Sequence, residues 1–126
     1  MPIDVVRDAR RRRITATGQG EFRADEVIDV LRKMREDDAW TYGVLVDLRL
    51  MTGEPTIRDL GPIMQITADA GSGADSTRGP VAIVATNPVI YGISCAYAAM
   101  SKPKGRAEVF RDREDAERWL DERMPL

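Results

Sequence analysis

Six of the polar residues whose types can bind anions fall into two groups along the chain. Each group directly follows a short apolar run, residues 44–48 in one case and residues 81–85 in the other. A guanidinium together with hydroxyl and amide groups at the starts of helices suits a phosphate, a carboxylate or a lipid headgroup. The candidate ligand-binding residues are Arg49, Thr52, Thr56, Thr86, Asn87 and Tyr91.

The two groups meet if the two apolar runs are neighbouring parallel strands. Short, nearly continuous apolar runs are typical of parallel strands that helices cover on both faces. Ligands of open α/β sheets bind beyond the carboxyl ends of such strands, so we expect one shared groove there. Thr56 and Asn87 also fit a simpler role, because helix N-caps use the same residue types. The sequence leaves both interpretations open.

The composition excludes several kinds of catalytic and metal site. The chain has no His and one Cys, Cys95. These counts exclude His-dependent triads, Cys–His nucleophile pairs, the usual zinc ligand sets and an internal disulfide. Acid–base or nucleophilic work would then fall to carboxylates, Lys or Tyr. We therefore expect a protein that is not an enzyme, with no catalytic residues, no metal and no cofactor.

Length and charge predict a single soluble domain that spans residues 1–126. A chain of 126 residues with 43% hydrophobic and 32% charged residues can bury its own core. The net charge of −2 excludes a strongly basic domain, so we expect no specific nucleic-acid partner. The four consecutive arginines at positions 10–13 indicate a solvated hairpin turn beside an edge strand, or alternatively a contact with anionic headgroups or phosphates.

Hydrophobic periodicity predicts an α/β domain with a mixed sheet and the order β-β-α-β-α-β-α-β-α. The first two strands form an antiparallel hairpin, and Gly18-Gln19-Gly20 is expected to interrupt the chain after it. Asn87 before Pro88 is a typical helix start, and Asp112 is a typical cap of the last helix. The predicted strands are residues 3–5, 14–17, 44–48, 81–85 and 107–110, and the predicted helices are residues 24–38, 57–70, 89–102 and 113–122.

Several strings along the chain, taken in order, resemble a known superfamily. They lie at residues 15–18, 46–49, 79–84, 87–92 and 109–116. The chain is similar to the SpoIIAA-like superfamily, which contains the STAS (anti-sigma-factor antagonist) and SEC14-like domains of bacteria. The resemblance implies a compact α/β domain that is usually not an enzyme and that binds a protein partner, a nucleotide or a lipid-like ligand.

The resemblance also raises an alternative function at Thr56. In phosphorylated STAS proteins, an Asp-Ser-Ser/Thr-Gly motif opens the helix after the central strand, and its hydroxyl accepts phosphate from a kinase. Here Thr56 falls at the corresponding helix start, but the motif around it is absent. The first hypothesis is therefore a module that binds an anionic or lipid-like ligand at the helix N-termini. The alternative is an anti-sigma-factor-antagonist-type interaction switch phosphorylated at Thr56.

The helix predicted from residue 89 onward is almost free of polar side chains, with small residues at Gly92, Ala96 and Ala99. Such a helix is either buried against the sheet, or its outer face meets a second subunit, an acyl chain or a bilayer surface. We accordingly expect a homodimer, with peripheral membrane contact as a further option. No run reaches the ~18 apolar residues of a membrane span and no secretory signal is evident. The expected location is the cytoplasm, including the inner face of the membrane.

Overall fold

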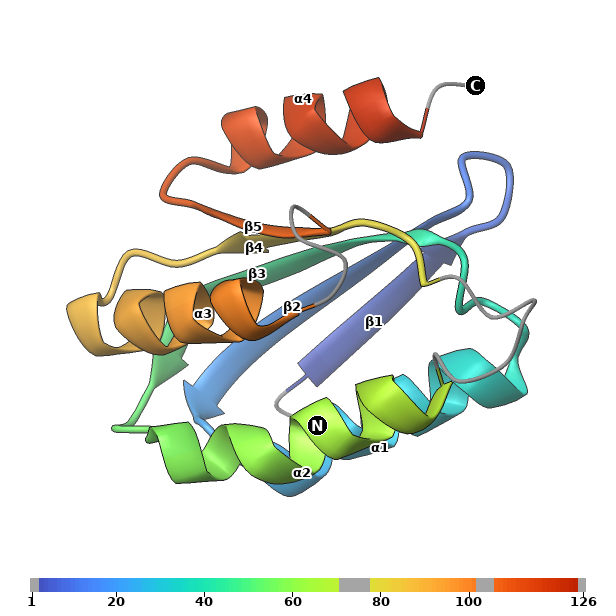
Figure 1. Cartoon of the computed structure of the whole chain (residues 1–126). Helices are drawn as coiled ribbons and strands as arrows, with labels where there is room; N and C mark the ends of the chain where they lie inside the picture. Colours follow the sequence, from blue (N-terminus) through green and yellow to red (C-terminus); the bar gives the residue numbers. More distant parts are fainter. Residues whose placement is uncertain (1–2, 71–77, 102–105, 125–126) are drawn as a thin grey trace.

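Five strands form one mixed sheet with the spatial order β1-β2-β3-β4-β5 (Figure 1). This computed structural model describes residues 3–70, 78–101 and 106–124. β1 pairs antiparallel with β2, and all later neighbours pair in parallel, as the sequence predicts. The strands are β1 (Ile3–Asp8), β2 (Arg13–Glu21), β3 (Gly43–Thr52), β4 (Val81–Val84) and β5 (Ala107–Phe110).

The helices cover the two faces of the sheet unequally. α1, α2 and α3 lie on one face, while α4 lies alone on the other (Figure 1). This division follows from right-handed crossovers, which place the helix of each strand–helix–strand unit on the same side. The helices are α1 (Ala24–Glu36), α2 (Ile57–Ala70), α3 (Pro88–Met100) and α4 (Arg113–Arg123).

The core accordingly has a large and a small part, divided by the sheet. Alternate residues of β3 and β4 point to opposite faces, which explains why both strands read as continuous apolar runs. The large part, under α1, α2 and α3, includes Ile14, Leu31, Ile63, Val81 and Ile83. The small part, under α4, consists of Leu45, Ala82, Val84, Ala116 and Leu120.

Strands β2 and β3 extend further than the sequence predicts. The Gly18-Gln19-Gly20 segment does not interrupt the chain but continues β2, and the pairing register shifts between Thr17 and Gln19. The irregularity lets both strands run on together, with Gln19 opposite Leu50. As a result Arg49 and Thr52 belong to β3 rather than to a loop beyond it.

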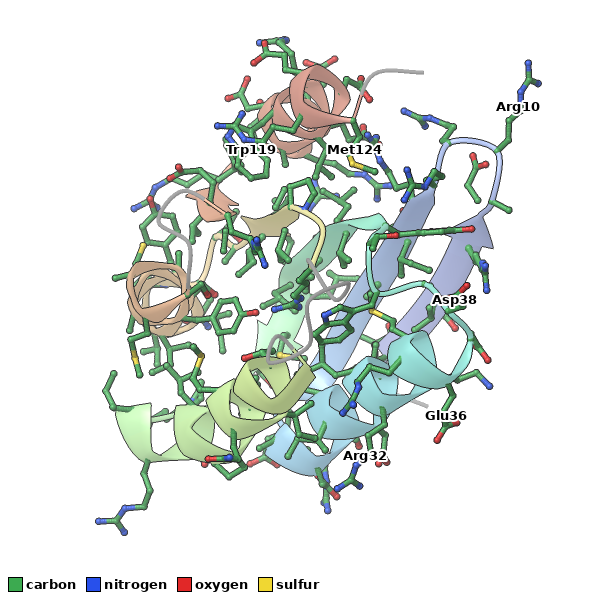
Figure 2. All side chains as sticks on the ribbon, turned by 45° about the vertical axis from the view of Figure 1, so that its right-hand side comes forward. Arg10, Arg32, Glu36, Asp38, Trp119 and Met124 are labelled. Atoms are coloured by element: carbon green, nitrogen blue, oxygen red, sulfur yellow. The ribbon has the colours of Figure 1, made fainter. Side chains whose placement is uncertain are left out.

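Side chains on the solvent side are charged where the sequence pattern predicts exposure. Arg32 and Glu36 point outward from α1, and Arg10 points away from the protein at the tip of the hairpin (Figure 2). Arg13 departs from this pattern, because it is only 4% exposed and donates to Asp121 at 2.9 Å. The arginine run is therefore a solvated turn at Arg10 but a buried contact with α4 at Arg13.

Candidate functional site

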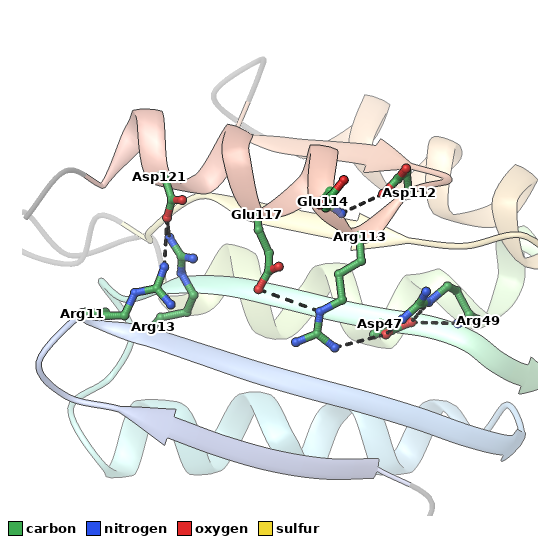
Figure 3. A network of polar contacts seen from close by, with 9 residues as sticks. All are labelled: Arg11, Arg13, Asp47, Arg49, Asp112, Arg113, Glu114, Glu117 and Asp121. Atoms are coloured by element: carbon green, nitrogen blue, oxygen red, sulfur yellow. Dashed lines mark hydrogen bonds and ion pairs between the residues drawn. The ribbon is translucent and has the colours of Figure 1, made fainter.

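Arg49 is held at the carboxyl end of the sheet by a buried carboxylate. Its Nε donates to Asp47 Oδ1 at 2.9 Å, and its Nη2 donates to Asp47 Oδ2 at 2.7 Å (Figure 3). Arg113 of α4 approaches the same carboxylate at 3.5 Å. The hydrogen bonds from Arg49 hold the pKa of Asp47 below its ordinary value, although burial acts in the opposite direction. Arg49 thus already has an anionic partner within the protein.

Thr56 and Asn87 take part in helix capping. The Asn87 side chain accepts hydrogen bonds from the backbone N–H groups of Val89 at 2.9 Å and Ile90 at 3.4 Å. At α2 the Asp59 carboxylate accepts from the Thr56 backbone N–H at 2.7 Å and from its hydroxyl at 3.3 Å. A phosphate on Thr56 would therefore lie beside a carboxylate, which repels it.

The other three candidates lie near the same edge but make no common site. Thr52 and Thr86 are exposed, and the Tyr91 ring lies 4.1 Å from the guanidinium carbon of Arg111. Among the described residues, the one hydrogen bond between two of the six candidates runs from the Tyr91 backbone N–H to the Asn87 carbonyl oxygen at 2.8 Å, in the first turn of α3. Next to them a small buried cluster of Met51, Ala85 and Ile90 occupies the space where β3 and β4 end.

A cavity of about 130 Å³ lies elsewhere, between the sheet and helices α1, α2 and α3. Its walls are almost entirely apolar and come from every element on that face of the sheet. Typical lining residues are Ala16, Leu31, Val46, Ile63, Ile83 and Ile90. An engineered apolar cavity of about 150 Å³ binds benzene, so this space is large enough for a small organic group. None of the six candidate residues lines it.

The cavity has one polar end, formed by Arg78, Ser94 and Tyr97. Arg78 donates from Nη1 to the Tyr97 hydroxyl, and its guanidinium carbon lies 5.1 Å from the centre of the Trp40 ring. Gly79 makes this placement possible, because a Cβ there would collide with the backbone carbonyl oxygens of residues 41 and 42. The Gly79 N–H also donates to the Trp40 carbonyl oxygen at 3.1 Å.

A second arginine, Arg106, lies at the same edge of the sheet as Arg78. Arg78 comes shortly before β4, and Arg106 directly precedes its parallel neighbour β5, so both lie at the amino ends of adjacent strands. Burial lowers the pKa of Arg106, and the nearby charge of Arg78 lowers it further. Within the described ranges 3–70, 78–101 and 106–124, neither arginine forms an ion pair.

Sequence reasoning missed this end of the molecule because it considered only the carboxyl ends of the parallel strands. A usable signal was nevertheless present. Trp40, Arg78 and Arg106 each come just before one of three strands predicted to be parallel. Parallel neighbours bring their amino ends together as surely as their carboxyl ends, so this spacing indicates that the three side chains share an edge.

The described residues form neither a metal-binding cluster nor a membrane-spanning helix. Among the described residues, no group of three or more His, Cys, Asp or Glu side chains is arranged to hold a metal ion. No helix in the same described ranges combines the length and the apolar character needed to cross a bilayer.

Comparison with known proteins identifies the fold. No family model matches the sequence, and no curated protein matches it. Among solved structures, the chain is similar to the crystal structure of an uncharacterized protein from the DUF3478 family with a SpoIIAA-like fold, from Shewanella loihica PV-4. The TM-score is 0.61 at 15% sequence identity, and the match covers 94% of this chain and 91% of that chain. The chain therefore has a SpoIIAA-like fold, which confirms the fold predicted from the resemblance.

Proposed function

From a SpoIIAA-like fold with an apolar cavity, we propose that this domain is a non-enzymatic module that binds a small lipid-like molecule. The site is the space between the sheet and helices α1, α2 and α3, rather than the carboxyl edge of the sheet. The observation that carries the proposal is the cavity itself. Protein interiors are close-packed, and voids much larger than one water molecule are few.

The size of the cavity supports a ligand. The apolar walls of this space of about 130 Å³ offer water almost no hydrogen-bond partners. A bound molecule with an apolar body would pack against these walls and stabilise the folded state by mass action. Because the lining residues come from three helices and the sheet, the ligand would also hold these helices in one arrangement. That coupling suits a regulatory or interaction module, which the SpoIIAA-like fold suggests.

Titration with hexanol by calorimetry tests this proposal. We expect saturable binding of one molecule to the wild-type protein, together with a higher Tm. Ala16→Leu fills part of the cavity and should abolish binding, and the milder Val46→Leu should weaken it. The matched control is Val6→Leu on β1, where Val6 is 65% exposed and pairs with Thr15, so it points to the other face of the sheet. Absence of saturable binding to the wild-type protein overturns the proposal.

The expected homodimer and peripheral membrane contact involve α3. This helix buries Ile90, Ser94 and Tyr97, while Val89 and Met100 remain 44% and 46% exposed. We propose that this outer face carries any self-association or membrane contact. Sedimentation of wild-type protein and of Met100→Glu, with and without anionic vesicles, tests it. A wild-type monomer that ignores vesicles counts against both expectations.

A further inference from the structure

We propose that the ligand of the cavity carries an anionic head, a carboxylate or a phosphate monoester, which Arg78 and Arg106 bind together with Trp40 and Tyr97. The apolar body of the ligand then extends into the cavity over the sheet. This inference rests on the function proposed above and assigns the chemistry of the ligand. The observations that support it are unpaired buried donors, uncompensated positive charge and continuity with the cavity.

Two buried donors, one on Arg78 at this end of the cavity and one on Trp40 beside it, have no acceptor among the described residues. The Nε of Arg78 and the Nε1 of Trp40 are both shielded from solvent and lack a hydrogen-bond partner among the described residues. A buried N–H that finds no acceptor is costly, and native proteins rarely leave such groups unpaired. The two donors belong to side chains in direct contact, since the guanidinium carbon of Arg78 lies 5.1 Å from the Trp40 ring centre. One anionic oxygen-bearing group can accept from both.

The Tyr97 hydroxyl supplies a third donor. Its oxygen accepts the hydrogen bond from Arg78, so its own proton stays available for an acceptor in the cavity. Tyr97 also lines the cavity beside Ser94. The polar end of the cavity therefore offers hydrogen-bond donors, and the described residues place no carboxylate there.

The arginines of this end differ from those at the opposite edge of the sheet. Around the start of α4, Arg49 and Arg113 are each paired with carboxylates, Asp47 and Glu117 (Figure 3). Arg78 and Arg106 instead precede adjacent parallel strands, and the charge of Arg78 lowers the pKa of Arg106. A bound anion replaces this repulsion with two charge-assisted attractions, and partial burial strengthens them.

The cavity also limits the size of the ligand. Arg78 and Tyr97 line the same space as Ile63 and Ile83, so the head and the apolar body occupy one continuous site. A volume of about 130 Å³ accommodates an apolar body of about six carbon atoms. The structure thus favours a short alkanoate or alkyl phosphate, or an aromatic acid of similar size, over a two-chain lipid.

A comparison of three six-carbon ligands tests the inference. Hexanoate, hexyl phosphate and hexanol contain six carbon atoms each and carry different head groups. The variant Trp119→Phe removes the tryptophan on α4, which lies on the other side of the sheet (Figure 2), and leaves Trp40 as the sole tryptophan reporter. We expect at least one anion to change Trp40 emission and to bind about tenfold more tightly than hexanol.

Variants of Arg106 then test whether this side chain binds the anion directly or whether the positive charge of the protein attracts anions in general. Arg106→Gln should remove most of the advantage of the anions and leave hexanol affinity unchanged, whereas Arg106→Lys should keep part of that advantage. The control Arg118→Gln, an exposed arginine paired with Asp115 on α4, should change nothing. Circular dichroism of each variant confirms that it is folded.

The outcomes are distinct. Equal affinity for all three ligands overturns the anionic head, and an anion advantage that survives Arg106→Gln overturns the role of Arg106 in binding it. Both outcomes leave the proposed function standing. If none of the three ligands binds, the proposed function itself fails, and this inference fails with it. Tighter binding of hexanoate assigns a carboxylate, and tighter binding of hexyl phosphate assigns a phosphate monoester.

Discussion

The buried charge of Asp47 is stabilised by two arginines, which lie two residues and 66 residues further along the sequence. Its carboxylate is 5% exposed and accepts two side-chain hydrogen bonds from Arg49, with Arg113 at 3.5 Å. The sequence indicates Arg49 as a ligand-binding residue because it ends an apolar strand. In the structure much of its hydrogen-bonding capacity is used internally, which spacing alone does not reveal.

We expect Asp47→Asn to lower the free energy of unfolding by about 1–3 kcal/mol at pH 7, because the neutral amide loses the charge-assisted bonds. The pKa of Asp47 is lower in the folded state, so its stabilisation is present above the ordinary carboxyl range and is lost as pH falls through the folded pKa. Urea unfolding at several pH values should show the two proteins converging at acidic pH. A constant difference at every pH contradicts this explanation.

Asp121 is the carboxylate that compensates buried Arg13. The side chain of Arg13 is 4% exposed, and its Nε and Nη1 already lack partners among the residues that the structure describes. Asp121→Asn should therefore lower the free energy of unfolding by about 1–3 kcal/mol. Asp115→Asn, which breaks the exposed pair with Arg118 at 3.4 Å, is the control and should change it by less than about 0.5 kcal/mol. Equal effects of the two substitutions would rule out a special role for Asp121.

At the scale of elements, the hydrophobic periodicity of the sequence predicts the helices, the strands and their order along the chain. The caps at Asn87 and Asp112 are confirmed by hydrogen bonds to the first turns of α3 and α4. The order of strands and helices is confirmed as well. The extension of β2 and β3 was missed, because it depends on a register shift between two strands, and a single strand's pattern carries no information about its partner.

Substitution of two glycines by alanine should change the stability of the protein in opposite directions. Gly79→Ala should destabilise the protein by about 1–3 kcal/mol, since the added Cβ collides with backbone carbonyls next to Trp40 and displaces the segment that carries Arg78. Gly92→Ala, inside α3 with open space around the new Cβ, should stabilise it by about 0.5–1 kcal/mol. Thermal unfolding of both variants checks the pair. A Gly79→Ala variant as stable as the wild type would contradict the close approach at Gly79, and destabilisation by Gly92→Ala would contradict the expectation for α3.

At the scale of the whole molecule, the fold was predictable from the sequence and the position of the cavity was not. The carboxyl edge has the helix N-termini that sequence reasoning relies on, but capping and internal ion pairs already engage Thr56, Asn87 and Arg49. The cavity lies between three helices and the sheet, and no local sequence pattern encodes such a space. The polar end of the cavity becomes apparent only when residues 40, 78 and 106 are placed at the same edge of the sheet.

The most direct measurement is a methyl NMR titration of the wild-type protein with hexanol and, separately, with hexanoate. The account predicts shifts at the methyl groups of Ile63 and Ile83, which line the cavity, and none at Leu45 and Leu120, which lie under α4 on the opposite face. Shifts confined to the carboxyl edge or to the α4 face, or no saturable shifts at all, would contradict it.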